Sequence, residues 1–167
     1  MNIRSIAPYI VAILAAVAIS NTAATKGMGK GQWHGRASVQ GSWEVRLTPV
    51  DCATGDPAPQ FAFDSYLTFG DGGTLVESTS NPNFQPGQRG SGHGYWDRSA
   101  PGSYAAVFQA FVHFDGGNRV RGTQRVESEL ELLDDDHWQG TAVIEFYDTA
   151  DALYFTGCAD TAAARIS

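Results

Sequence analysis

The stretch RVRGTQRVESELEL, residues 119–132, decides the fold class of this chain. All of its charged side chains fall at odd-numbered positions, whereas the even-numbered positions carry only Val, Gly, Gln, Ser and Leu. Successive side chains of a β-strand point to opposite faces, so this period of two predicts a strand with one solvated face and one buried face. The rest of the sequence shows no convincing helical stripe, and we therefore predict an all-β fold.

Turn signals divide the chain into further strands. The segments 71–73 and 115–117 both read Asp-Gly-Gly, and glycine accepts the positive φ of a hairpin turn without steric cost. The segment 103–114 is apolar on both faces, as expected of a strand that lies between a core and a second packed layer or a ligand. The predicted strands are 41–50, 60–69, 73–79, 93–98, 103–114, 118–133, 138–148 and 151–159.

Eight sequential strands joined by hairpins have no helix to cover an open sheet. Closure into a barrel removes the exposed edges, so we predict an eight-stranded antiparallel up-and-down barrel. The first and last strands of such a barrel are neighbours, and Cys52 and Cys158 lie at the ends of these two strands. A disulfide between these two cysteines would lock the barrel where it closes.

The start of the chain has the pattern of a secretory signal peptide. Arg4 precedes an almost purely apolar run from Tyr9 to Ile19, and small residues follow, which places cleavage before Thr25. The apolar run is shorter than the ~20 residues that a membrane-spanning helix needs, so the mature form is predicted to have no membrane span. Secretion or export to a periplasm is expected, and export favours the disulfide. The predicted parts are a signal peptide over 1–24, a flexible lead over 25–40 and a barrel domain over 41–167.

Composition excludes some partners. Eighteen acidic residues against eleven basic ones, without a basic cluster, match neither nucleic acid nor an anionic membrane. The run Asp134-Asp135-Asp136-His137 lacks the ligand spacing of a calcium loop and is predicted to be a solvated hairpin tip. His113 is expected to be a structural histidine with its hydrogen bonds satisfied. No metal site and no cofactor are predicted.

Two resemblances support the barrel. Gly41-Ser-Trp43 opens the first predicted strand and Arg165 follows the last, which resembles the calycins, the lipocalin-like barrels. This resemblance implies that Arg165 stacks on Trp43 at the closed end of the barrel. The chain also resembles a group of small exported bacterial proteins through segments 41–45, 48–55, 90–98 and 156–158. The second resemblance strengthens the expected fold and export, and it implies no activity.

Candidate ligand contacts come from the strands. His93 lies between two glycines, so it could act as a general base or hydrogen-bond a ligand, or the glycines could serve a tight crossing while His93 caps a backbone carbonyl. Tyr95 and Trp96 point to opposite faces, so one ring should enter the barrel. The inward Gln124 and Ser128 could bond each other, water or a ligand. The predicted ligand-binding residues are His93, Tyr95, Trp96, Tyr104, Phe108, Gln124 and Ser128.

Three functions follow as hypotheses. The sequence holds neither a Gly-x-Ser-x-Gly nor a His-Glu-x-x-His motif, so no catalytic residue is assigned. The leading hypothesis is an exported barrel that binds a small hydrophobic molecule inside. One alternative is an inhibitor-like module that binds another protein at the cell surface through the loop at 80–92. Another is a barrel isomerase or cyclase that uses His93 and Tyr95 in a buried pocket.

Overall fold

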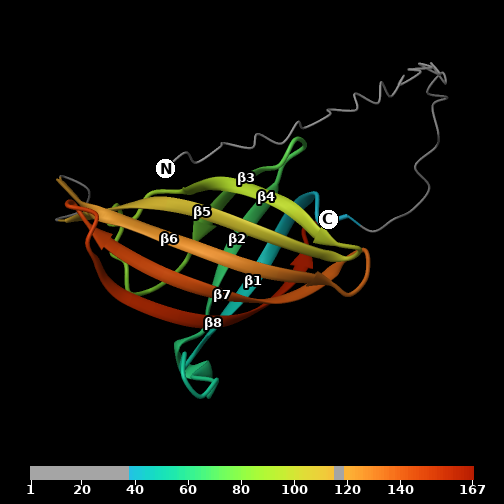
Figure 1. Cartoon of the computed structure of the whole chain (residues 1–167), viewed down its shortest axis with the longest axis horizontal. Helices are drawn as coiled ribbons and strands as arrows, with labels where there is room; N and C mark the ends of the chain where they lie inside the picture. The colour runs from blue at the N-terminus through green and yellow to red at the C-terminus, as the bar shows by residue number, and fades with distance from the viewer. Residues whose placement is uncertain (1–37, 115–118) are drawn as a thin grey trace, which may run out of the picture. The chain divides into compact units, whose positions relative to one another are not determined.

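The computed structural model describes residues 38–114 and 119–167, and these form a closed barrel of eight antiparallel strands (Figure 1). Each strand pairs with the next along the chain, and β8 returns to pair with β1. The predicted up-and-down barrel is therefore confirmed. The strands are β1 Gly41–Val50, β2 Phe63–Phe69, β3 Thr74–Thr79, β4 Gly92–Ala100, β5 Ser103–Phe114, β6 Arg119–Leu132, β7 His137–Asp148 and β8 Leu153–Arg165.

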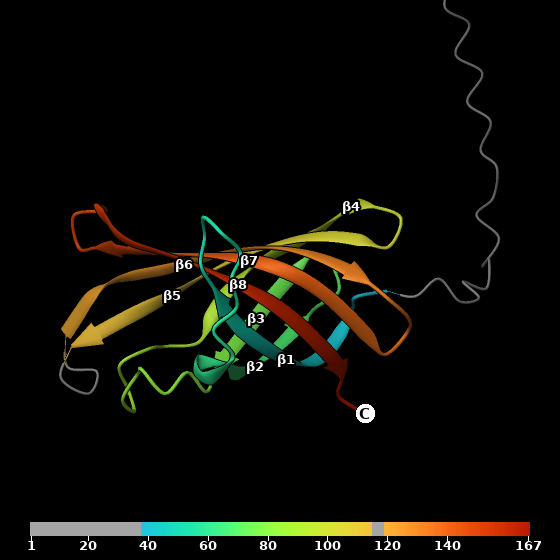
Figure 2. The same cartoon turned by 90° about the horizontal axis from the view of Figure 1, so that it is seen from below.

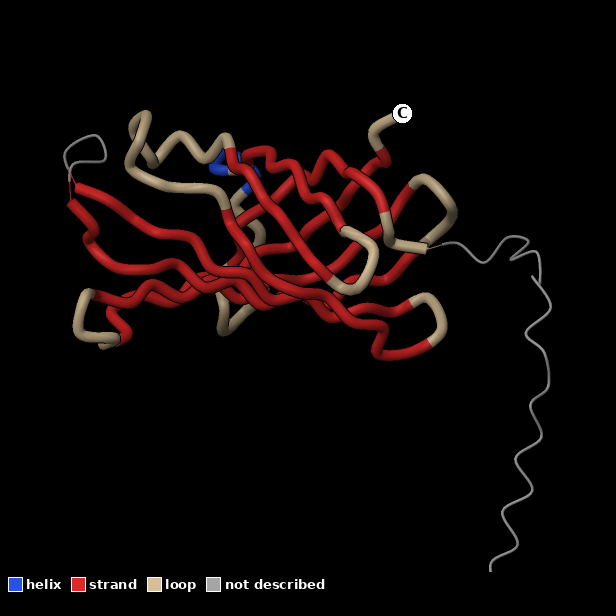
Figure 3. Tube along the Cα trace, turned by 90° about the horizontal axis from the view of Figure 1, so that it is seen from above, coloured by secondary structure: helices blue, strands red, loops and turns tan. Residues whose placement is uncertain are grey.

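Helix is nearly absent from the described residues. A single 3-10 turn, η1 Pro59–Phe61, replaces the start of the strand that was predicted to begin at 60 (Figure 3). Within the described ranges, no helix has the length and apolar character needed to cross a membrane. The predicted signal peptide and nearly all of the predicted lead fall within residues 1–37, which lie outside the described residues.

The barrel wall alternates as the strand pattern predicts. In β6 the side chains of Gln124, Val126, Ser128 and Leu130 are buried inside the barrel, while the glutamates between them are exposed. The largest fully buried side chains, Trp43, Trp138, Phe69, Leu75, Val39 and Val45, gather towards the end of the barrel where β1 begins. Burial of a large apolar side chain contributes about 1.5–3 kcal/mol, so this core stabilises one end of the barrel most strongly.

Trp43 and Arg165 close that end. The Arg165 guanidinium carbon lies 4.1 Å from the centroid of the Trp43 ring, and Trp43 Nε1 donates to the carbonyl oxygen of Val39 at 2.7 Å. Arg165 also donates to the carbonyl oxygens of Gln40 at 2.6 Å and Ser38 at 2.8 Å. One side chain thus holds the segment before β1 against the end of β8.

The last strand is longer than predicted. It was expected to end at 159 with Arg165 beyond it, but β8 continues to Arg165, which pairs with Trp43. The final residues include Ala162, Ala163 and Ala164, and alanine is a weak strand former. Pairing with β1 on one side and β7 on the other supplies the strand structure that the sequence does not signal.

Replacing Arg165 with Met should lower the free energy of unfolding by about 2 kcal/mol, because the variant loses a cation–π contact and charged hydrogen bonds at a partly exposed site. Urea unfolding measures this loss. Arg165→Lys keeps the charge without the planar fork, so it should recover only part of it. An unchanged unfolding midpoint in Arg165→Met would contradict the proposed role of this contact.

The disulfide is present where the sequence placed it. Cys52 and Cys158 are bonded, and they are separated by 106 residues in sequence. Cys158 lies opposite Val50 in the pairing of β1 with β8, whose strands lie side by side (Figure 2). The bond therefore joins the turn that follows β1 to β8, and disulfides are typical of proteins that leave the reducing cytosol.

The loop at 80–91 joins β3 to β4 at the other end of the barrel, away from Trp43. Two backbone hydrogen bonds attach it to β5: His113 N donates to Gln88 O at 2.7 Å, and Gly90 N donates to Phe111 O at 3.0 Å. The loop carries Arg89 between these two attachments. This geometry fixes the position of Arg89 at the barrel interior.

Candidate functional site

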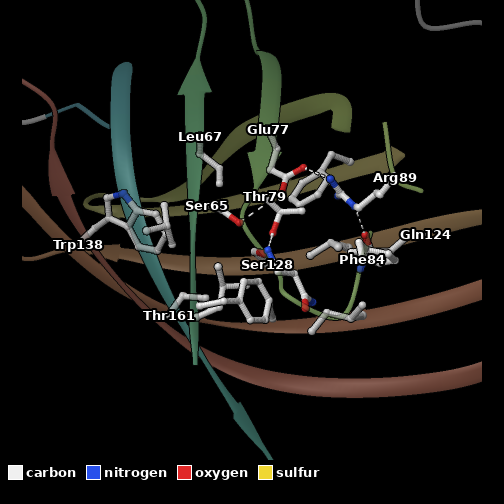
Figure 4. Close-up of a pocket in the computed structure, with 18 residues that line it drawn as sticks. Ser65, Leu67, Glu77, Thr79, Phe84, Arg89, Gln124, Ser128, Trp138 and Thr161 are labelled. Atoms are coloured by element: carbon white, nitrogen blue, oxygen red, sulfur yellow. Dashed lines mark hydrogen bonds and ion pairs between the residues drawn. The ribbon is translucent and has the colours of Figure 1, made fainter. Parts of the chain in front are cut away.

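The barrel interior holds a small cavity of about 40 Å³ (Figure 4). A buried water needs at least ~10–15 Å³, and an engineered cavity of ~150 Å³ accepts benzene, so this cavity has room for a few waters only. Most of its wall is apolar, with contributions from Val45, Leu67, Phe108, Val126 and Ile144. The cavity is thus mostly filled by the protein's own side chains.

A buried ion pair lies in this wall. Arg89 Nη1 is 2.7 Å from Glu77 Oε2, and the two side chains are only 4% and 3% exposed. Arg89 Nε donates to Gln124 Oε1 at 2.5 Å, and the hydroxyl of Ser65 donates to Glu77 Oε1 at 3.4 Å. Figure 4 shows Arg89 between Glu77 and Gln124. We call Ser65, Glu77, Arg89 and Gln124 the polar cluster.

Local sequence explains how Glu77 enters the barrel. Leu75, Glu77 and Thr79 share the inward face of β3, while the residues between them are exposed. Gly92 lies opposite Glu77 on β4, and a Cβ at Gly92 would crowd both the Glu77 carboxylate and the Phe108 ring. The absence of a side chain at Gly92 therefore makes room for the carboxylate.

Burial raises the pKa of the Glu77 carboxyl above its ordinary value of 4.5, and the Arg89 guanidinium opposes this effect only in part. Weaker opposing effects come from hydrogen bonds with Arg89, Ser65 and Gly92. The native protein therefore binds the Glu77 proton more tightly than the unfolded chain does.

Glu77 should make stability depend on pH. Because its native pKa is raised, its contribution is fully present below 4.5 and is lost as the pH rises through the native pKa. The free energy of unfolding of the wild type, relative to Glu77→Gln, should therefore fall between pH 4.5 and neutrality. Urea unfolding of both proteins across this range tests it. A difference that stays constant with pH would exclude Glu77 as the titrating group.

Further polar groups on the cavity wall have no partner. Trp138 Nε1 and Thr161 Oγ1 are buried, and neither makes a hydrogen bond with any described residue. Ser128 is also buried, on β6, and its side chain lines this wall. Glu77 Oε2 is ion-paired but accepts no hydrogen bond of good geometry there. Buried polar groups without hydrogen bonds lower the stability of the folded state, so they mark this wall as a place where another molecule could bind.

The structure separates the predicted ligand-binding residues into three groups. Phe108, Gln124 and Ser128 line the cavity. Trp96 and Tyr104 point inward but do not line it; their rings contact one another at 5.8 Å between centroids nearer the Trp43 end. The inward ring of the Tyr95–Trp96 pair is therefore Trp96, whose Nε1 donates to Gly70 O at 3.0 Å.

His93 and Tyr95 lie on the outer face of β4, and Tyr95 is 61% exposed. The prediction that they contact a ligand inside the barrel was wrong, because the even-numbered residues of β4 face inward. A Cβ at Gly94 would overlap the carbonyl oxygen of Val107, so the glycines beside His93 serve close packing. An isomerase or cyclase that uses these two residues in a buried pocket is incompatible with this geometry.

The structure also tests the predictions for two side chains, Gln124 and His113, and for the hairpin tip at 134–137. Gln124 bonds Arg89 and not Ser128. His113 is half-buried, but its Nδ1 has no hydrogen-bond partner in the described part of the chain, contrary to the expected satisfied histidine. The segment 134–137 is the exposed tip of the β6–β7 hairpin, as predicted, with His137 Nδ1 3.0 Å from Asp134 Oδ1.

Sequence reasoning missed the two charged members of the polar cluster. The sequence held a signal for Glu77, because it alternates in step with Leu75 and Thr79 and so shares their face of a short strand. None existed for Arg89, which lies in a loop without periodicity.

No protein-family model matches the chain, and no curated protein matches its sequence.

Proposed function

We propose that this chain is an exported calycin-like barrel that binds a small, mostly apolar ligand in its interior. The observation that carries the proposal is the polar cluster, with its buried ion pair, set in a mostly apolar cavity wall. A buried ion pair is often no more stabilising than apolar residues of the same volume, so stability alone does not explain its presence. Orienting the polar end of a ligand does explain it.

Export is part of the proposal and has separate support. The Cys52–Cys158 disulfide suits an oxidising compartment, and the pattern of residues 1–24 suits a cleaved signal peptide. Secretion and periplasmic retention are both compatible with these features.

Phe84 provides the route into the barrel. It lies on the loop at 80–91, lines the cavity and packs against Phe146 with 6.3 Å between ring centroids. Phe146 also contacts Tyr154 and Phe155, so an aromatic surface continues from the cavity onto the β7–β8 hairpin. A ligand can enter if Phe84 moves outward along this surface, which would add the volume of a benzyl group to the cavity.

Toluene should therefore bind to the wild type, and Phe84→Ala should bind it about tenfold or more tightly, because the variant no longer has to displace the ring. A titration followed by protein NMR, with the indole N–H of Trp138 as the reporter, measures both affinities. Phe61→Ala removes a ring that is 62% exposed on η1 and should leave the affinity unchanged. If neither toluene nor a polar derivative of the same skeleton gives a saturable shift in the cavity residues of the wild type, the ligand-binding proposal fails.

A further inference from the structure

We infer that the ligand of this barrel is an uncharged molecule with an apolar body and one hydrogen-bonding oxygen, a hydroxyl above all, held against the polar cluster. The inference rests on the proposed function and specifies its ligand class. It follows from three observations: the net charge of the cavity wall, the polar atoms of that wall that have no partner, and the volume of the cavity.

The charge of the site is already balanced. Glu77 and Arg89 are the only ionisable side chains among the described residues that line the cavity, and they form one ion pair. An ionised ligand would add an uncompensated charge to a buried site, which is strongly unfavourable. A carboxylate would also be repelled by Glu77, and an ammonium group by Arg89. The wall therefore selects against both kinds of ion.

The unpartnered atoms call for a group that both accepts and donates hydrogen bonds. Trp138 Nε1 can only donate, and the hydroxyl of Thr161 can do either. Glu77 Oε2 can only accept, and it is already ion-paired with Arg89. A ligand hydroxyl can accept from one of the donors or donate to the carboxylate, whereas a pure hydrocarbon leaves all of them unsatisfied.

Size limits the apolar body. The cavity of about 40 Å³ cannot hold a ring by itself, so the ligand occupies the place that Phe84 vacates. The ligand class is accordingly that of a small ring or short branched chain, close in size to a benzyl group.

Four ligands with one skeleton test the inference on the wild type: benzyl alcohol, toluene, benzoate and benzylammonium at neutral pH. Benzyl alcohol should bind most tightly, and both ions should bind about tenfold or more weakly than it does, as measured by the same NMR titration. Toluene should fall between them. If either ion binds as tightly as the alcohol, the inference is overturned while the proposed function stands. If none of the four binds, the proposed function itself fails.

Charge variants sharpen the test. Glu77→Gln leaves Arg89 uncompensated, so benzoate should gain about tenfold or more relative to benzyl alcohol. The double variant Glu77→Gln, Arg89→Gln restores neutrality and should again prefer the alcohol. Asp64→Asn removes an acidic partner from the exposed Arg46 pair on the outer wall and should leave the order of the four ligands unchanged. A benzoate preference in the double variant, or the same order in Glu77→Gln as in the wild type, would overturn the inference.

Discussion

Arg89→Met should lower the free energy of unfolding at neutral pH by about 3–5 kcal/mol, the usual cost of removing one partner of a buried ion pair. The substitution leaves the Glu77 carboxylate without its counter-charge and removes the donor that satisfies Gln124. This loss in the free energy of unfolding should be smaller at acidic pH, because Glu77 can then take up a proton and become neutral. Urea unfolding at two pH values measures both effects.

The matched control for this prediction lies on the outer wall. Arg46 Nη1 lies 2.9 Å from Asp64 Oδ1, but the two side chains are 51% and 47% exposed. Such surface pairs contribute about 0–1 kcal/mol, so Arg46→Met should change stability little. Equal losses in Arg89→Met and Arg46→Met would show that burial of the Glu77–Arg89 pair has no energetic consequence.

Replacing both cysteines with serine should lower the free energy of unfolding by about 4–5 kcal/mol, because the Cys52–Cys158 bond closes a loop of roughly 100 residues in the unfolded chain. On this account the bond acts mainly on the unfolded state. The folded variant should therefore keep the native environment of Trp43 and Trp138, which near-UV circular dichroism reports.

The free energy of unfolding of this variant, measured by urea unfolding, can also contradict this account. If the cysteine-free variant loses less than about 1 kcal/mol, entropy of the unfolded chain is not what the bond contributes. Reduction of the wild type under native conditions should match the double serine variant, since both remove only the cross-link.

The barrel itself could be predicted because its rules are local. Each charged side chain of β6 marks the solvated face, so one strand reveals which residues point inward. Glycine-rich turns then set the number of strands. With that number known, adjacency of β1 and β8 follows, and it brings Cys52, just after the end of β1, next to Cys158 of β8.

The candidate site resisted prediction because its members meet only through the fold. Arg89 gains its inward position from two backbone hydrogen bonds between its loop and β5, and nothing in the loop sequence encodes them. On β4 the inward positions include Gly92 and Gly94, which have no side chains to signal the buried face. The conspicuous residues of that strand, His93 and Tyr95, are therefore the outward ones.

The two attachments between β1 and β8 determine which neighbouring strands of the barrel can separate. The disulfide fastens one end of that join and the Trp43–Arg165 contact fastens the other, so the ring cannot widen there. The shortest join in the ring is between β3 and β4, which pair only from Thr74 to Glu77. That join carries Glu77 and is followed directly by the loop of Phe84 and Arg89. The shortest join and the charged groups of the cavity thus lie on one side of the barrel, and the β1–β8 join acts as its fixed frame.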